Sequence, residues 1–204
     1  MRLQSDVQNV SAITVKTFGV RAVDSSGCDI DVWGEQAELG SFATSFIPTA
    51  GSTVTRAHEF VQLFYDNFSN WYNQGEGSFL TSAEAIGLHP SNQNTVLTTD
   101  GSRLPEFKFN VGTATVYNAT LGSYTQNVST PKANFGFSLD GAGGTHAING
   151  AVNTVANTTV NDANTKLYLG KYFTSAAFSY SGHISRLSYY NERLTAADLT
   201  TLTS

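Results

Sequence analysis

The chain has 204 residues, of which 13% are charged, and its formal net charge is −5 at pH 7. The lysines and arginines are scattered and form no basic stripe, so we do not expect nucleic acid to be a direct partner. The single cysteine excludes an internal disulfide framework and a cysteine-rich zinc site.

The sequence also lacks the apolar segments that mark a membrane or export route. No run approaches the ~18 apolar residues needed to span a bilayer. The start, Met-Arg-Leu-Gln-Ser-Asp, has no apolar core of the signal-peptide kind. We therefore expect synthesis in a cytoplasm and no membrane insertion.

Residues 12–33 predict a β-hairpin. Apolar residues alternate from Ala12 to Val23, Ser25-Ser26-Gly27 supplies a turn, and Cys28 to Trp33 returns as a second strand. A lone hairpin is marginally stable in water, so this one must pack on the main domain or on another subunit. We assign residues 1–55 to a hairpin arm and linker, and residues 56–204 to the main domain.

The hairpin predicts a subunit interface, because unpaired strand edges beside apolar side chains attract other chains. Strand addition to a neighbour would satisfy the backbone and bury the apolar face. We expect a homo-oligomer, most simply a trimer, or docking on another protein of the same assembly. The interface residues would be Ile13, Val15, Ile30, Val32 and Trp33.

The main domain shows short strand signals at regular intervals. A long strand is expected at 78–86, and a hairpin is expected around Asn149-Gly150, the strongest turn signal of the chain. Further strands are expected at Phe107 to Val111, Thr113 to Tyr117, Ser123 to Gln126, Asn134 to Leu139 and Lys166 to Gly170. With one credible helix, this spacing predicts an all-β antiparallel sandwich.

The closing segment, residues 181–202, predicts a strand followed by a short helix. Gly182 introduces a run rich in β-branched and aromatic residues. Thr195 is then a credible N-cap with Asp198 three residues later, and Leu194 lies just outside the cap.

This segment resembles the end of laminin-G-like, concanavalin-A-like jelly-roll domains, in which a Gly-X-Ile-X-X-Leu-X-X-Tyr strand runs into a Leu-Ser/Thr-X-X-Asp/Glu-Leu helix. The matching residues, in order, are Gly182, Ile184, Leu187, Tyr190, Leu194, Thr195, Asp198 and Leu199. Residues 40–56 resemble the linker that precedes such domains in tailed-bacteriophage structural proteins. The resemblance implies a jelly-roll sandwich in a virion, as a decoration, tail or fibre component with other virion proteins as partners.

A candidate catalytic site consists of Asp29, Asp31, Trp33 and Glu35, which strand alternation would place on one face. Two carboxylates ~5 Å apart are what a retaining glycosidase needs. The stretch resembles the catalytic strand of laminarinase-like glucanases only loosely, because Asp replaces the first Glu and the last Glu falls one position late. We expect no enzymatic activity, and a carbohydrate-active enzyme of the glucanase type is the alternative.

No cofactor is expected. The histidines, His58, His89, His146 and His183, show no metal-ligand spacing. Asp140-Gly-Ala-Gly-Gly and Asp162-Ala-Asn164 contain oxygen ligands for Ca²⁺, but neither has the acid density of a dedicated loop. We favour the interpretation that both stretches form turns and caps and bind no Ca²⁺.

Exposed aromatic residues are the remaining candidates for function, since Tyr and Trp stack on sugars while polar neighbours bind the hydroxyls. The candidates for carbohydrate binding are Trp71, Tyr72, Tyr117, Tyr124 and Tyr180. Each has a competing interpretation as a core or interface residue. Adhesion to a host-surface glycan is the expected use of such a site, and a lectin-like module of a larger adhesin is a third hypothesis.

Overall fold

The computed structural model describes residues 46–55, 61–86, 94–100, 105–156, 164–172 and 179–204. Contacts within the chain divide it into two compact units, Met1–Ala57 and His58–Ser204, and every described helix and strand lies in the second. The predicted hairpin and its interface residues Ile13, Val15, Ile30, Val32 and Trp33 lie outside the described residues, as do Asp29, Asp31 and Glu35. The hairpin arm therefore stays a prediction.

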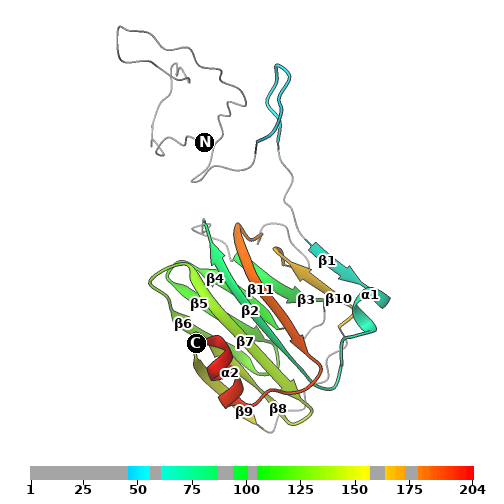
Figure 1. Ribbon diagram of the computed structural model, residues 1–204, viewed down its shortest axis with the longest axis vertical. Coiled ribbons are helices and arrows are strands. Elements are labelled where there is room, and N and C mark those ends of the chain that lie inside the picture. The colour runs from blue at the N-terminus through cyan, green and yellow to red at the C-terminus, as the bar shows by residue number, and fades with distance from the viewer. Residues whose placement is uncertain (1–45, 56–60, 87–93, 101–104, 157–163, 173–178) are drawn as a thin grey trace. The chain divides into compact units, whose positions relative to one another are not determined.

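The second unit is a sandwich of two antiparallel sheets (Figure 1). The six-stranded sheet has the order β1 (Val61–Phe64), β10 (Lys166–Leu169), β3 (Asn94–Thr99), β4 (Glu106–Asn110), β5 (Thr113–Asn118) and β6 (Gly122–Asn127). The five-stranded sheet has the order β11 (Gly182–Tyr190), β2 (Gly77–Ala85), β7 (Lys132–Asp140), β8 (Gly143–Ile148) and β9 (Ala151–Ala156). This arrangement confirms the predicted antiparallel β-sandwich.

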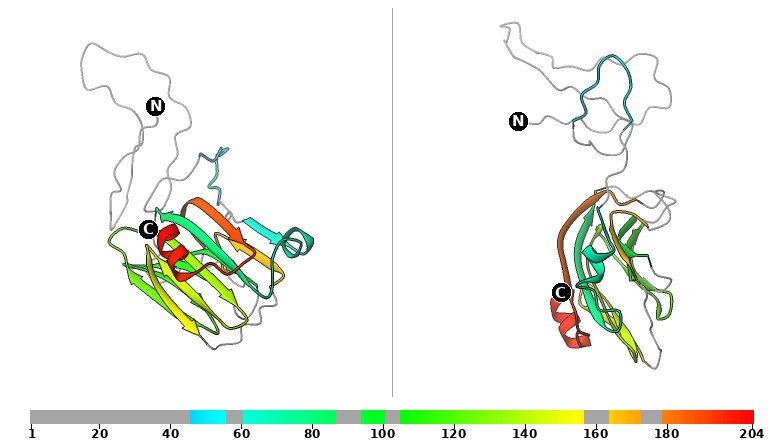
Figure 2. Two further views of the ribbon diagram at one scale, coloured as in Figure 1. Left: turned by 60° about the horizontal axis from the view of Figure 1, so that its bottom comes forward. Right: turned by 90° about the vertical axis from the view of Figure 1, so that its right-hand side faces the viewer.

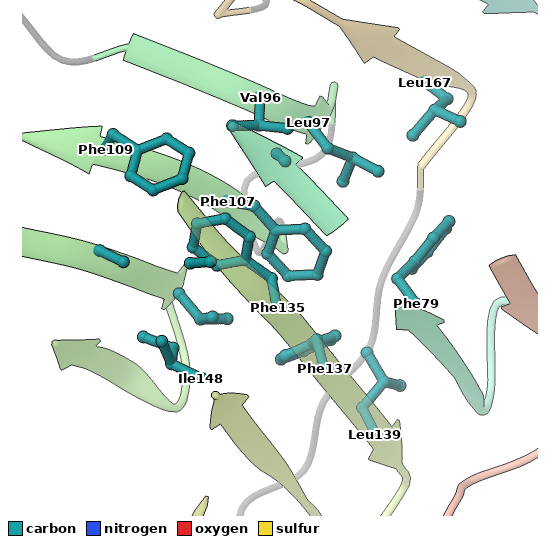
Figure 3. Close-up of a cluster of buried hydrophobic side chains, with 14 of the residues drawn as sticks. Phe79, Val96, Leu97, Phe107, Phe109, Phe135, Phe137, Leu139, Ile148 and Leu167 are labelled. Atoms are coloured by element: carbon teal, nitrogen blue, oxygen red, sulfur yellow. The ribbon is translucent and has the colours of Figure 1, made fainter. Parts of the chain in front are cut away.

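Alternating phenylalanines fill the space between the sheets (Figure 3). Phe107 and Phe109 of β4 point inward, and Phe135 of β7 meets them with ring centroids 5.4 and 5.2 Å away. All three rings are fully buried, and each such burial stabilises the fold by roughly 1.5–3 kcal/mol. Because neighbouring residues on a strand face opposite sides, Glu106 and Lys108 must then lie on the outer face of the six-stranded sheet.

The hairpin between β8 and β9 forms at Asn149-Gly150, as the sequence predicts. Asn149 has φ 49° and Gly150 has φ 79°, and the two-residue turn of this type needs positive φ at both positions. Asn149 Oδ1 accepts a hydrogen bond from Asn134 N at 2.8 Å, and Gly150 N donates to Thr203 Oγ1 at 3.0 Å. The turn is therefore tied to β7 and to the C-terminal helix.

The closing segment also folds as predicted, with β11 followed by helix α2 (Ala196–Thr203). Thr195 Oγ1 accepts from Asp198 N at 3.1 Å, and Asp198 Oδ2 accepts from Thr195 N at 3.1 Å, which completes a capping box. Leu199 packs with Leu80 and Ala147 of the sheet beneath it. Helix α2 thus covers the outer face of the five-stranded sheet (Figure 2).

Strands β1 and β3 were not predicted from the sequence, and neither was the single-turn helix α1 (Asp66–Ser69). Its N-cap residue, Tyr65, makes no side-chain capping bond and has φ 46°, so the usual helix-start signal is absent. Tertiary packing holds the turn instead, because Phe68 is fully buried and stacks on Tyr72 with ring centroids 4.5 Å apart. In the described part of the chain, no helix is long and apolar enough to cross a membrane.

Candidate functional site

A line of side chains crosses all six strands on the outer face of the six-stranded sheet. The register places Tyr168 opposite Thr98, Thr98 opposite Glu106, and Glu106 opposite Tyr117. Gln62 lies opposite Tyr168 at one end, and Ser123 lies opposite Tyr117 at the other. The cross-strand row consists of Gln62, Tyr168, Thr98, Glu106, Tyr117 and Ser123.

An ion pair lies at the centre of this row. Lys108 Nζ donates to Glu106 Oε2 at 3.1 Å, and Thr95 Oγ1 donates to Glu106 Oε1 at 3.1 Å. Glu106 is only 2% exposed, and burying a carboxylate is costly unless such partners compensate it. The Lys108 side chain keeps 12% of its area exposed. The ammonium therefore lies closer to solvent than the carboxylate that holds it.

Three tyrosines accompany the lysines of this face, of which Tyr168 is 7% exposed and therefore buried, whereas Tyr117 and Tyr172 are half-buried. Lys108 Nζ lies 5.4 Å from the ring centroid of Tyr117, and Lys171 Nζ lies 5.5 Å from that of Tyr168, both within cation–π range. Burial raises the pKa of the Tyr172 hydroxyl, and the charge of Glu106 and the neighbouring Tyr117 raise it further. Tyr172 follows β10, the strand that contributes Tyr168 to the row.

The arrangement can bind an extended polar molecule that also has apolar faces. Tyr168 and Tyr117 are three strand spacings apart, about 14 Å at ~4.8 Å per spacing. Between and around them lie hydroxyls, a carboxylate and ammonium groups that donate or accept hydrogen bonds. Helix α2 lies on the other sheet, so no described helix covers this face (Figure 2). Aromatic faces with convergent polar groups are the usual composition of a ligand site.

Of the five aromatic residues expected to contact sugar, Tyr117 alone belongs to the row. Tyr72 is 7% exposed, and its hydroxyl accepts a hydrogen bond from Asn164 Nδ2 at 2.9 Å. Its ring lies in the core cluster, so it does not offer the exposed face that the expectation required.

Tyr124 and Tyr180 also pack against the core. The ring of Tyr180 stacks on Phe109 at 6.4 Å, and its hydroxyl donates to the carbonyl of His183 at 3.1 Å. Tyr124 lies on β6 opposite Val116, a fully buried residue, and therefore faces inward. Tyr124 and Tyr180 therefore do not present the exposed stacking rings that were expected of them. The cause is strand register, because it decides which of the alternating residues face the core.

Trp71 is the fifth candidate and lies at the end of the α1 turn rather than in the row. It is 37% exposed, but its Nε1 donates to the carbonyl of Asn67 at 2.7 Å. Its ring meets those of Phe68 and Tyr189 edge-on, with centroids 5.0 Å away in both cases. These contacts hold the Trp71 ring over the edge of the core.

Sequence reasoning did not single out Glu106, Lys108, Tyr168 or Tyr172. The alternation Glu106-Phe107-Lys108-Phe109 was a usable signal, since it places two opposite charges on one face of a strand. Tyr168 had no comparable local signal, because its place in the row depends on β10 pairing with β3.

A recess lies where α2 begins. It has a volume of about 270 Å³ and is lined by Thr145, Thr154, Arg193, Leu194, Thr195 and Ala196. Arg193 Nη1 donates to Asp140 Oδ2 at 2.9 Å, and the hydroxyls of Thr145 and Thr154 hydrogen-bond to each other at 3.0 Å. Arg193 and the two threonines already have hydrogen-bond partners and none of the lining residues is aromatic, so the cross-strand row is the stronger candidate.

Asp140 serves as a turn residue, in agreement with the interpretation of Asp140-Gly-Ala-Gly-Gly as a turn. Its Oδ1 accepts from Ala142 N at 2.8 Å. Burial would raise the pKa of Asp140, but hydrogen bonds from Arg193 and Ala142 bring it below its ordinary value. Asp162 of the other calcium candidate lies outside the described residues. Within the described ranges, no group of three or more His, Cys, Asp or Glu residues could hold a metal ion.

The described histidines take no part in the row. His146 is fully buried between the sheets, where its ring stacks on Phe137 at 5.6 Å. Burial lowers the pKa of His146 to about 4, so the ring is neutral. His183 is exposed on β11, and His58 and His89 lie outside the described residues.

No family model and no curated protein matches the chain, but solved structures do. The CBM40 carbohydrate-binding module of Ruminococcus gnavus IT-sialidase, bound to α2,3-sialyllactose, is 14% identical with a TM-score of 0.53. The match covers 68% of this chain and 88% of that one. NanB with Optactamide is 11% identical with a TM-score of 0.54, and the match covers 72% of this chain but 26% of NanB. At these identities the likeness shows the fold alone, a lectin-like β-sandwich.

Proposed function

We propose that this protein is a lectin-like module that binds an oligosaccharide along the cross-strand row. The observation that carries the proposal is the buried Glu106–Lys108 ion pair beside Tyr117 on the outer face of the six-stranded sheet. A sheet gains little stability from such a pair, since an apolar replacement often serves as well or better. A binding role explains why the polar groups converge there.

The fold neighbour from Ruminococcus gnavus supports the ligand class. That module has the same sandwich architecture and is bound to an oligosaccharide, α2,3-sialyllactose. The row crosses all six strands of the sheet, a length of about 24 Å at ~4.8 Å per spacing, which exceeds a single sugar ring and suits a chain of several rings. The ligand of this protein is therefore an oligosaccharide that lies across the strands.

The proposed setting is the virion of a tailed bacteriophage. It is supported by the resemblance of residues 40–56 to the linker that precedes laminin-G-like jelly-roll domains in tailed-bacteriophage structural proteins, and residues 181–202 resemble the closing segment of such domains. In this setting the chain is a decoration, tail or fibre component with other virion proteins as partners. The module would then attach the particle to a host-surface glycan.

The proposed activity is binding without hydrolysis. A glycosidase needs two carboxylates, about 5–5.5 Å apart in retaining enzymes and about 6.5–9.5 Å in inverting ones. The strands of the six-stranded sheet carry one carboxylate, Glu106, and Lys108 occupies one of its oxygens. Incubation with β-glucans and bacterial polysaccharides should release no products. Release that is lost in Asp31→Asn or Glu35→Gln would establish the glucanase alternative.

A glycan array tests the binding proposal. The full chain should bind a subset of bacterial-surface oligosaccharides, and Tyr117→Ala should weaken that binding by roughly tenfold, because truncating an aromatic anchor of a binding surface costs more than about 1 kcal/mol. Tyr65→Ala is the matched control, since Tyr65 is 70% exposed and lies outside the row. Equal binding by both variants would reject the row as the site.

A further inference from the structure

The turn between β8 and β9 contains the one Asn-Gly pair of the chain, Asn149-Gly150. An Asn-Gly pair deamidates readily in a flexible peptide, because glycine has no side chain to hinder attack of its backbone nitrogen on the preceding asparagine. Asn149 is exposed to solvent, and Gly150 is half-buried. The asparagine side of the turn is therefore open to water.

Deamidation forms one bond and breaks another. The backbone nitrogen of Gly150 attacks Asn149 Cγ, the Cγ–Nδ2 bond breaks, and the proton from the Gly150 nitrogen leaves with the departing ammonia. The succinimide that results takes up one water molecule and opens to aspartate or isoaspartate at position 149. Water is the only co-reactant, and no group is oxidised or reduced.

The two reacting groups are held by different elements of the fold. Gly150 N donates to Thr203 Oγ1 of α2 at 3.0 Å, so the proton that must leave is bound to the helix. Asn149 Oδ1 accepts from Asn134 N of β7 at 2.8 Å, and Asn149 N donates to the carbonyl of Asn134 at 2.9 Å. The asparagine side chain is thus directed to β7, while the glycine nitrogen is directed to α2.

The end of α2 closes over the glycine. Thr203 is 1% exposed, and its Oγ1 donates to the carbonyl of Leu199 at 2.7 Å, which leaves the oxygen free to accept from Gly150. Ser204 lies against the same glycine, since a Cβ atom built on Gly150 would come within 2.8 Å of Ser204 Oγ. The last turn of the helix therefore holds and covers the nucleophile of the reaction.

We infer that Asn149 is a deamidation site that the last turn of α2 keeps inactive. Helix ends open locally more often than sheet cores do. When Thr203 moves away, the Gly150 nitrogen loses its partner and becomes free to attack Asn149. An isoaspartate adds an atom to the backbone, which a two-residue turn cannot accommodate. The modification would thus detach the turn from α2 permanently.

Incubation of the full chain at mildly alkaline pH tests the inference, with peptide mapping by mass spectrometry to follow aspartate and isoaspartate at position 149. Thr203→Val removes the hydroxyl and keeps the shape, so conversion should be roughly fivefold faster, the factor that corresponds to one hydrogen bond of about 1 kcal/mol. Thr201→Val is the matched control, because Thr201 is exposed on the same helix and its Oγ1 donates to the carbonyl of Ala197 at 3.0 Å.

A conservative variant separates the hydrogen bond from general loosening of the helix. Thr203→Ser keeps a hydroxyl at the same position and should convert as slowly as the unaltered protein. Urea denaturation of each variant checks its fold. Equal rates for Thr203→Val and Thr201→Val would overturn the role of Thr203.

The unfolded chain supplies a reference that needs no variant. In concentrated urea, where α2 is absent, Asn149 should convert much faster than in the folded protein at the same pH. All variants should then share one rate, because the hydroxyl of Thr203 has no turn to hold. A folded protein that converts as fast as its unfolded chain would overturn the inference.

Discussion

Gly136 of β7 lies directly beneath Leu199 of helix α2. A Cβ atom built on Gly136 would come within 3.2 Å of Leu199 Cδ2 and within 3.0 Å of Thr203 Cγ2. The missing side chain therefore lets the helix pack closely on the outer face of the five-stranded sheet. Helix α2 therefore covers the five-stranded sheet at β7, and no described helix lies over the other sheet.

Replacing Gly136 should destabilise the sandwich. Gly136→Ala forces a methyl group against Ala147, Leu199 and Thr203, and overpacking of this kind costs about 1–3 kcal/mol. Urea denaturation should show that loss in the free energy of unfolding. Gly141→Ala is the control, because nothing lies within 4 Å of its Cβ position. Equal stability of the two variants would mean that α2 does not pack as described.

The capping box should contribute measurably to stability. Thr195→Ala removes the hydroxyl that accepts from Asp198 N, and loss of an N-cap costs typically about 1 kcal/mol. Thr195→Ser keeps the hydroxyl and should retain most of the stability. The measurement is again the free energy of unfolding in urea. A Thr195→Ala variant as stable as the unaltered protein would show that the helix is held by Leu199 alone.

His146 should make the protein less stable in acid. The folded protein keeps the ring neutral until its pKa of about 4, whereas the unfolded chain takes up a proton near 6.5. Stability is therefore complete above pH 6.5 and falls as the pH drops toward 4. The difference in pKa corresponds to a loss on the order of 3 kcal/mol.

Replacing His146 separates its contribution to the pH dependence of stability from that of the carboxylates. His146→Leu should remove that part of the pH dependence, while His183→Gln should preserve it, because His183 is exposed. Urea denaturation at a series of pH values gives the comparison. Parallel pH profiles for His146→Leu and the unaltered protein would exclude His146 as the cause.

Local signals made much of the fold predictable. Asn149-Gly150 forms its turn because only a few residue types accept positive φ, and Thr195 with Asp198 caps a helix through contacts three residues apart. Glu106, Phe107, Lys108 and Phe109 alternate as a half-buried strand must. Features of this kind depend on neighbours in the chain, so the sequence alone shows them.

The candidate site depends on pairing between distant segments and was largely missed. Tyr168 and Glu106 lie in one row, with Thr98 between them, only because β10, β3 and β4 pair in a register that no local pattern reveals. For the same reason Tyr72 and Tyr180 could not be assigned to the core from the sequence, although Tyr117 was among the residues chosen. The helix α1 was missed because a single turn is too short to show a helical period.

The N-terminal arm should control assembly. We predict that the full chain is an oligomer and that deletion of residues 1–40 leaves a soluble, folded β domain that no longer assembles, since the strand edges that recruit a neighbour are gone. Size-exclusion chromatography with light scattering gives the mass of each. An oligomer that survives the deletion, or a full chain that is a monomer, would contradict this role.

The central claim is that a glycan binds across the six-stranded sheet, and NMR titration tests it most directly. The full chain, labelled with ¹⁵N, would be titrated with the tightest oligosaccharide from the array, and backbone amide shifts would be followed residue by residue. The account predicts that the largest changes fall at Thr98, Glu106, Tyr117 and Tyr168, with little change along α2. Changes confined to α2 and the recess around Arg193, with Glu106 and Tyr117 unaffected, would contradict it.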